Sequence, residues 1–139
     1  MTKYFVNTLQ MATQQTVRPT KLELSILKVL WESGPLSVRE IQNILDSRKP
    51  TGYTTVLKML QIMTEKGLVD RDETVRPQIY RARHSQEQTQ RHLVRDLLDR
   101  AFGGSVKALV MQALASKKSS PKDLEAIEKL LDRMEGGSK

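Results

Sequence analysis

Four polar side chains cluster at the beginning of a helix that the sequence predicts in the middle of the chain. Tyr53, Thr54, Thr55 and Lys58 fall within its first two turns. A threonine hydroxyl donates or accepts at a base edge, its methyl group packs on a thymine methyl, and a lysine reaches a guanine edge. A tyrosine hydroxyl at the helix start can bond a phosphate. The spacing indicates a helix that presents its first turns to DNA.

Three arginines follow in a basic segment that predicts a β-hairpin. Residues 68–72 and 78–82 are strand-like, and the segment between them contains Pro77 and forms the turn. Arg76 lies at the tip, where it can reach a minor groove or the DNA backbone. Arg81 and Arg83 suit phosphates. This hairpin therefore predicts a second contact with DNA, in addition to the contact made by the helix at 53–66.

Each of these groups also has a purely structural interpretation. Thr54 and Thr55 can cap the helix, because threonine hydroxyls accept hydrogen bonds from amide groups of the first turn. Lys58 can be a solvated side chain, and the arginines can simply point outward from a strand. Trp31 suits a hydrophobic core better than a stacking surface.

Catalytic and metal-binding chemistry has little support in the sequence. The chain has no cysteine, which excludes thiolate metal sites, disulfides and cysteine nucleophiles. Its two histidines, His84 and His92, lie beyond the i, i+4 spacing that brings two ligands together on a helix. A metal hydrolase built on them is the weakest hypothesis, and we expect no enzyme activity, no metal and no cofactor.

Composition limits the remaining classes of protein. The chain has 139 residues, an apolar share of 38% and a formal net charge of +7, with basic residues spread along its length. A basic balance suits a polyanionic partner. No apolar run approaches the roughly 20 residues needed to span a bilayer, and the N-terminus lacks the apolar core of a signal peptide. We therefore expect a cytoplasmic protein without membrane insertion.

Local signals place the elements that must position these groups. Thr20 with Glu23, and Ser37 with Glu40, have the spacing of capping boxes and predict two helices after residues 20 and 37. Gly34-Pro35 ends the first helix, and Leu36 suits a short strand pairing. Lys66-Gly67 ends the helix that begins near Tyr53, with a cation near the negative end of the helix dipole.

The residues after 84 predict three more helices with apolar stripes. About 50 residues cannot bury a self-sufficient core, so these stripes need either the preceding domain or a second chain. A second copy would place two DNA-contacting helices about one DNA turn apart. The stripe residues that we expect at a dimer interface are Leu93, Leu97, Val106, Leu109, Val110, Leu124, Ile127 and Leu131.

In combination, several motifs resemble the penicillinase-repressor family, which includes the methicillin-resistance repressors. The resemblance covers about residues 20–135. It rests on Leu27-Lys28-Val29-Leu30-Trp31-Glu32-Ser33-Gly34-Pro35-Leu36-Ser37, Tyr53-Thr54-Thr55-Val56, Lys66-Gly67-Leu68-Val69 and Phe102-Gly103-Gly104-Ser105.

This resemblance implies a homodimeric winged-helix repressor of operator DNA. It also implies a membrane sensor protease, or its downstream signal, as a partner, because resistance members are cut between Asn and Phe in the second C-terminal helix. Gln112-Ala113 stands at the matching place here. The cysteine metal motif of the family's copper-responsive branch is absent from this chain.

The sequence thus predicts a mainly α fold with a small β-hairpin. We expect a flexible arm over residues 1–19, a winged helix-turn-helix domain over 20–84, and a three-helix dimerisation domain over 85–139. The predicted function is a homodimeric transcriptional repressor of a palindromic operator, released by an unidentified signal. The alternative is a winged-helix module that binds a protein instead of specific DNA.

Overall fold

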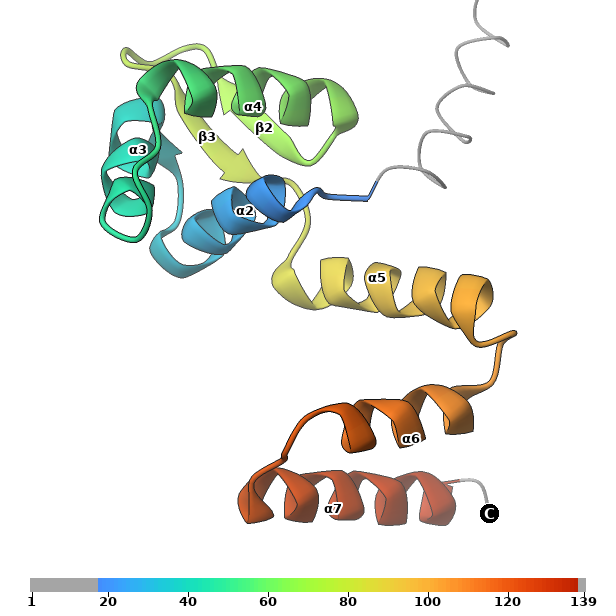
Figure 1. Ribbon diagram of the computed structural model, residues 1–139. Helices are drawn as coiled ribbons and strands as arrows, with labels where there is room; N and C mark the ends of the chain where they lie inside the picture. The colour runs from blue at the N-terminus through green and yellow to red at the C-terminus, as the bar shows by residue number, and fades with distance from the viewer. Residues whose placement is uncertain (1–17, 138–139) are drawn as a thin grey trace, which may run out of the picture. The chain divides into compact units, whose positions relative to one another are not determined.

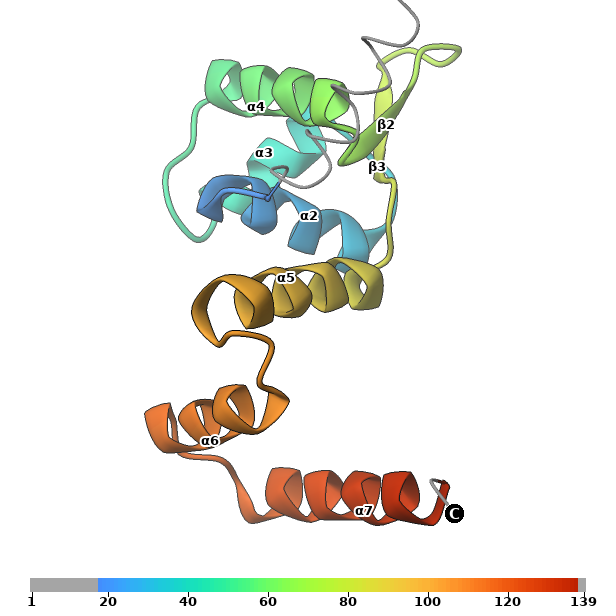
Figure 2. The ribbon, with the colours of Figure 1, turned by 90° about the vertical axis from the view of Figure 1, so that its right-hand side faces the viewer.

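A computed structural model describes residues 18–137 of the chain. The chain divides into two units between Leu93 and Val94. In the first unit, three helices and a small sheet pack together (Figure 1, Figure 2). The predicted arm over residues 1–19 lies almost entirely outside the described residues.

The first described helix, α2 (Lys21–Ser33), begins at the predicted capping box. The Glu23 amide donates to the Thr20 hydroxyl at 3.2 Å, and the Thr20 amide donates to Glu23 Oε1 at 2.8 Å. Gly34 ends the helix with a φ of 83°, a conformation that side chains disfavour. The predicted boundaries of this helix are confirmed.

Ser37 joins a short strand to the second helix. It is the last residue of β1 (Leu36–Ser37) and the N-cap of α3 (Val38–Asp46). Its hydroxyl accepts from the Glu40 amide at 3.2 Å, and its own amide donates to Glu40 Oε1 at 2.9 Å. The bond from the Ser37 amide to the carboxylate, followed by a smaller effect of the Ser37 hydroxyl, lowers the pKa of Glu40 because both favour its charged form. The second capping box is also confirmed.

The third helix, α4 (Tyr53–Lys66), ends in a left-handed glycine as predicted. Gly67 has a φ of 80°, and the Leu68 amide donates to the Met63 carbonyl at 2.9 Å. A Cβ on Gly67 would also lie 2.9 Å from Nη1 of Arg83. The positive φ therefore favours glycine here, whereas the flexible end of the arginine side chain could shift to make room for a Cβ.

The predicted hairpin consists of β2 (Val69–Asp72) and β3 (Ile79–Ala82), and we call residues 69–82 the wing. The antiparallel strands have the order β1-β3-β2, so β3 is central. Tyr80 pairs with Leu36 on one side and with Arg71 on the other. The short pairing expected at Leu36 is thereby confirmed, and it ties the wing to the turn before α3.

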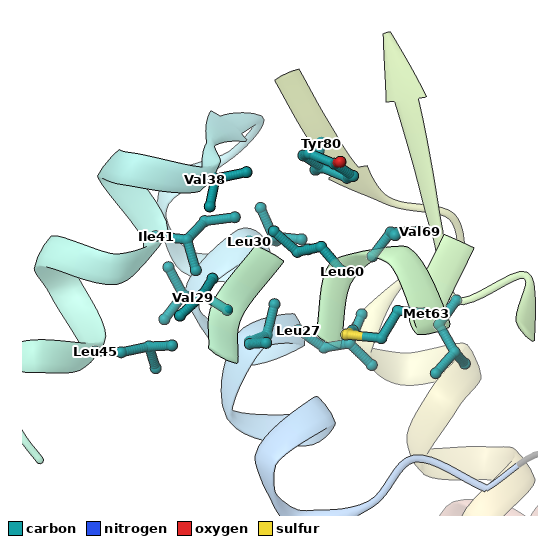
Figure 3. Packing of buried hydrophobic residues seen from close by; sticks show 13 residues of the cluster. Leu27, Val29, Leu30, Val38, Ile41, Leu45, Leu60, Met63, Val69 and Tyr80 are labelled. Carbon is teal, nitrogen blue, oxygen red and sulfur yellow. The ribbon is translucent and has the colours of Figure 1, made fainter. Parts of the chain in front are cut away.

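A single hydrophobic cluster holds these elements together (Figure 3). Val56, Leu60 and Met63 on α4 have no exposed surface, and the ring of Tyr80 on β3 is 1% exposed. A fully buried aliphatic side chain contributes about 1.5–3 kcal/mol, so this cluster is the main stabilising contribution. Its other members are Ile26, Leu27, Val29, Leu30, Val38, Ile41, Leu45, Leu68 and Val69.

A partly buried ion pair joins α2 to α4. The ammonium group of Lys66, the last residue of α4, lies 3.0 Å from both carboxylate oxygens of Glu23 on α2. The Glu23 side chain is 1% exposed and that of Lys66 is 31% exposed. The sequence assigned Glu23 to helix capping and Lys66 to the helix dipole, and it gave no sign that the two side chains meet.

The helices after the wing have no buried core. They are α5 (Gln86–Ala101), α6 (Val106–Ser116) and α7 (Pro121–Gly137), as predicted from their apolar stripes. No residue from 81 to 136 is buried. Leu131 is 55% exposed and Val106 is 61% exposed. Their apolar faces therefore remain in contact with solvent in a single copy of the chain.

Candidate nucleic-acid interface

Three polar residues near the start of α4 form an exposed face opposite the core, and Tyr53 lies exposed beside them at the first position of the helix. Tyr53, Thr54, Thr55 and Lys58 are all exposed, whereas Val56 is fully buried. This alternation follows from helical spacing, which points residues 54, 55 and 58 away from residues 56 and 60. The structure therefore groups Thr54, Thr55 and Lys58 on one accessible face, whereas Tyr53 is exposed on the side of the helix toward α3.

Capping does not occupy the two threonines. The N-cap of α4 is Gly52, and no side chain caps the helix. Among the residues that the structure describes, neither threonine hydroxyl takes part in a hydrogen bond, and Lys58 has no carboxylate partner. Amide groups in the first turn of a helix attract anions. The hydroxyls, the lysine and this helix end are thus available to a negatively charged ligand.

Side chains of α3 hold the turn that sets the position of α4. The Thr51 amide donates to Oδ1 of Asp46 at 3.0 Å, and Nε2 of Gln42 donates to the Thr51 carbonyl at 3.3 Å. Both bonds fix the turn between the helices without using any residue of the exposed face.

Arg39 extends this surface onto α3. Its guanidinium carbon lies 4.7 Å from the centroid of the Tyr53 ring, a cation–π geometry. The sequence singled out Tyr53 but missed Arg39, because the contact joins residues on two different helices. The only local signal was its place in the first turn after the Ser37 cap.

The four arginines of the wing region differ in their partners. Arg83 donates through Nε and Nη2 to Oδ1 of Asp70, at 2.9 and 2.8 Å. Arg81 Nε lies 3.8 Å from Oδ2 of the same aspartate, and Arg71 bonds Glu73 at 2.6 Å. Arg76 has no carboxylate partner within the described part of the chain. It is therefore the wing arginine with its charge fully available.

The connection between the wing strands is ordered by a short aspartate turn. Oδ1 of Asp72 accepts from both the hydroxyl and the amide of Thr74. These bonds lower the pKa of Asp72, since they favour the carboxylate, and the charge of Arg81 adds a smaller effect. The carboxylate therefore holds the loop that leads to Arg76 at neutral pH.

The beginning of α4 and the wing loop border the same pocket. It has a volume of about 410 Å³, and its lining includes Tyr53, Leu57 and Arg76. The start of α4 and the wing loop, which β2 separates in the sequence, are thus brought together, as a joint DNA-binding surface requires.

Asp70→Asn is expected to strengthen DNA binding about fivefold, because it releases Arg81 and Arg83 from a carboxylate that offsets their charge. The salt dependence of log K should steepen by about one for each additional phosphate contact. Fluorescence anisotropy titrations of labelled DNA over a range of KCl concentrations would measure both effects.

Asp99→Asn on α5 is the matched control, since it makes the same change in charge at a residue that is no part of α4 or the wing. It should leave the salt dependence nearly unchanged. Weaker binding by Asp70→Asn would contradict the expectation and would show that Asp70 orients the two arginines for DNA.

The two histidines make no metal cluster with other side chains. Within residues 18–137, no group of three His, Cys, Asp or Glu residues could hold a metal ion. The His84 carbonyl instead accepts from the indole N–H of Trp31 at 3.0 Å, and Trp31 packs against the core. No helix in the described range is long and apolar enough to cross a membrane.

The residues expected at a dimer interface are exposed or half-buried. Leu93, Leu109 and Ile127 are half-buried, whereas Val106 and Leu131 are among the most exposed apolar side chains. The remaining three are also exposed: Leu97, Val110 and Leu124.

The helix-turn-helix, the exposed start of α4 and the basic wing define a winged-helix DNA-binding regulator. The chain matches the penicillinase repressor family over residues 19–133, and it belongs to that family of transcriptional regulators. The transcriptional regulator BlaI of Mycobacterium tuberculosis is 27% identical over 118 residues, which cover 84% of each chain, and it matches equally from a second strain.

One solved structure also aligns with most of the chain. It is a MarR family protein from Bacillus stearothermophilus, with 18% identity and a TM-score of 0.47 over 98% of this chain and 89% of that chain.

Proposed function

We propose that the protein is a homodimeric, cytoplasmic repressor that binds a palindromic operator. In this proposal α4 lies in the major groove, with Thr54, Thr55 and Lys58 at base edges. Tyr53 and the arginines Arg76, Arg81 and Arg83 contact the backbone or the neighbouring minor groove. The observation that carries the proposal is the uncapped start of α4, whose two threonine hydroxyls have no hydrogen-bond partner among residues 18–137.

The C-terminal helices would supply the dimer. We assign residues 20–84 to DNA binding and residues 85–139 to dimerisation. The lack of any buried residue from 81 to 136 supports this assignment, because apolar stripes of this extent become stable when a second copy covers them. Two-fold symmetry would place the two α4 helices about one DNA turn apart and would require an operator with matching symmetry.

Release of the operator would follow from a signal that weakens the dimer or its DNA complex. A membrane sensor protease, or its downstream signal, is the source suggested by the family. Gln112-Ala113 lies in the exposed second half of α6, which would be accessible to cleavage. Mass determination of the protein recovered from its source cells before and after induction would reveal such a cut.

Thr55→Ala and Lys58→Ala should each weaken specific DNA binding about tenfold while leaving the dimer intact, because each removes one contact at a base edge. A gel-shift titration against the DNA upstream of the protein's own gene would measure the loss. Glu65→Ala, at an exposed position in the last turn of α4, is the control.

Equal affinities for both variants and the parent would refute the assignment of α4. DNA binding releases phosphate counterions and therefore weakens as the salt concentration rises. An affinity that does not change with salt would instead favour the protein-interaction module.

A further inference from the structure

The pocket beside α4 has the charge of an anion-binding site. This open pocket of about 410 Å³ is bordered by α3, the start of α4 and the wing. Arg39 from α3 and Arg76 from the wing line it, and no carboxylate among the described residues does. Two cations thus face one pocket from elements that lie far apart in the sequence.

Both guanidinium groups are available to a ligand. Within residues 18–137, neither arginine forms an ion pair. Arg39 is nevertheless held in place, since it lies over the Tyr53 ring at 4.7 Å and Nη1 donates to Oε1 of Gln42 at 3.3 Å. A guanidinium group that is positioned by neutral partners retains its full charge for an anion.

The rest of the lining suits a phosphate that carries a sugar. Val38, Leu57 and Tyr80 provide apolar surface next to the two arginines. The space exceeds what a lone phosphate needs, and the pocket borders the exposed start of α4. A DNA strand whose bases meet Thr54 and Thr55 would therefore pass its backbone across this pocket.

We propose that this pocket binds one phosphodiester group of the DNA backbone between Arg39 and Arg76. The inference rests on the proposed DNA binding and adds to it a named phosphate site that joins α3 to the wing. Phosphate contacts fix the register of a protein on the duplex. Arg39 thereby becomes a positioning residue for the base contacts of α4.

Arg39→Gln tests the site in the full-length chain. We expect about tenfold weaker binding to the operator, the loss typical of one charge-assisted hydrogen bond. The slope of log K against log salt should fall by about one. Arg48→Gln is the matched control, because Arg48 lies beyond α3 and pairs with Glu32 at 3.7 Å. It should leave both quantities unchanged, and circular dichroism would confirm that both variants fold.

Neutralising single phosphates of the operator identifies the contact. A methylphosphonate at the bound position should weaken the parent about tenfold and should weaken Arg39→Gln by a smaller factor, since one of the two arginine contacts to that phosphate is already lost. If the methylphosphonate and Arg39→Gln reduce the affinity additively at every phosphate tested, the proposal is overturned.

Two other outcomes separate the site from the proposed function. Normal affinity and salt slope for Arg39→Gln, while Lys58→Ala binds weakly, would reject the phosphate site alone. No specific DNA complex for the parent would reject the proposed function. Benzoate serves as the probe for a small organic anion: binding that displaces DNA and requires Arg39 would assign the pocket to such an anion and overturn the phosphate assignment.

Discussion

Lys66→Met is expected to lower the free energy of unfolding by about 3 kcal/mol, because it leaves a buried carboxylate without its cation. Both oxygens of Glu23 lie 3.0 Å from the Lys66 ammonium, and the Glu23 side chain is 1% exposed. Urea unfolding followed by the fluorescence of Trp31, the single tryptophan, would report on this unit.

A double-mutant cycle separates the effect of the unpaired Glu23 charge from the effect of the altered side-chain packing. Glu23→Gln retains an oxygen that can accept from the Thr20 amide, and combined with Lys66→Met it removes both charges. The double variant should therefore be more stable than Lys66→Met alone. Arg48→Met is the surface control in the same unit, since its pair with Glu32 is exposed and contributes less than about 0.5 kcal/mol. Similar losses of unfolding free energy for Lys66→Met and Arg48→Met would contradict the buried role.

Leu131→Asp is expected to convert the protein into a monomer and to weaken binding to a two-half-site operator by at least about 100-fold. A charge in the apolar stripe of α7 would oppose its burial between two copies. Losing the dimer removes the gain in affinity from linked half-sites, typically about 10²–10⁴. Analytical ultracentrifugation and anisotropy titration would measure the two effects on the same samples.

Lys129→Asp is the matched control on the same helix. Lys129 is exposed and lies on the side of α7 opposite the stripe formed by Leu124, Ile127 and Leu131. The Lys129→Asp variant should remain dimeric and keep nearly the full affinity for the operator. A dimeric Leu131→Asp would exclude this stripe from the interface.

The local elements of the fold were predictable because their signals lie within a few residues of one another. Thr20 with Glu23, Ser37 with Glu40, and Gly67 each specify a helix end through bonds to the neighbouring backbone. Helical spacing likewise predicted that Thr54 and Thr55 are exposed.

Side-chain pairing across the fold was not predictable in this way. Glu23 and Lys66 are 43 residues apart, and Arg83 reaches Asp70 over 13 residues. Nothing in a single sequence links such positions, because the contact exists only after α2, α4 and the wing have packed. The availability of each wing arginine for DNA therefore depends on carboxylates that the sequence pattern leaves unassigned.

The most direct test of the central claim is a footprint of the protein on the DNA upstream of its own gene. If α4 and the wing of two copies bind a symmetric operator, the footprint should show two protected half-sites whose centres lie about 10 base pairs apart, or a multiple of that spacing. Lys58→Ala should lose this protection at concentrations that protect the parent. Uniform weak protection without symmetric half-sites at physiological salt would contradict the account.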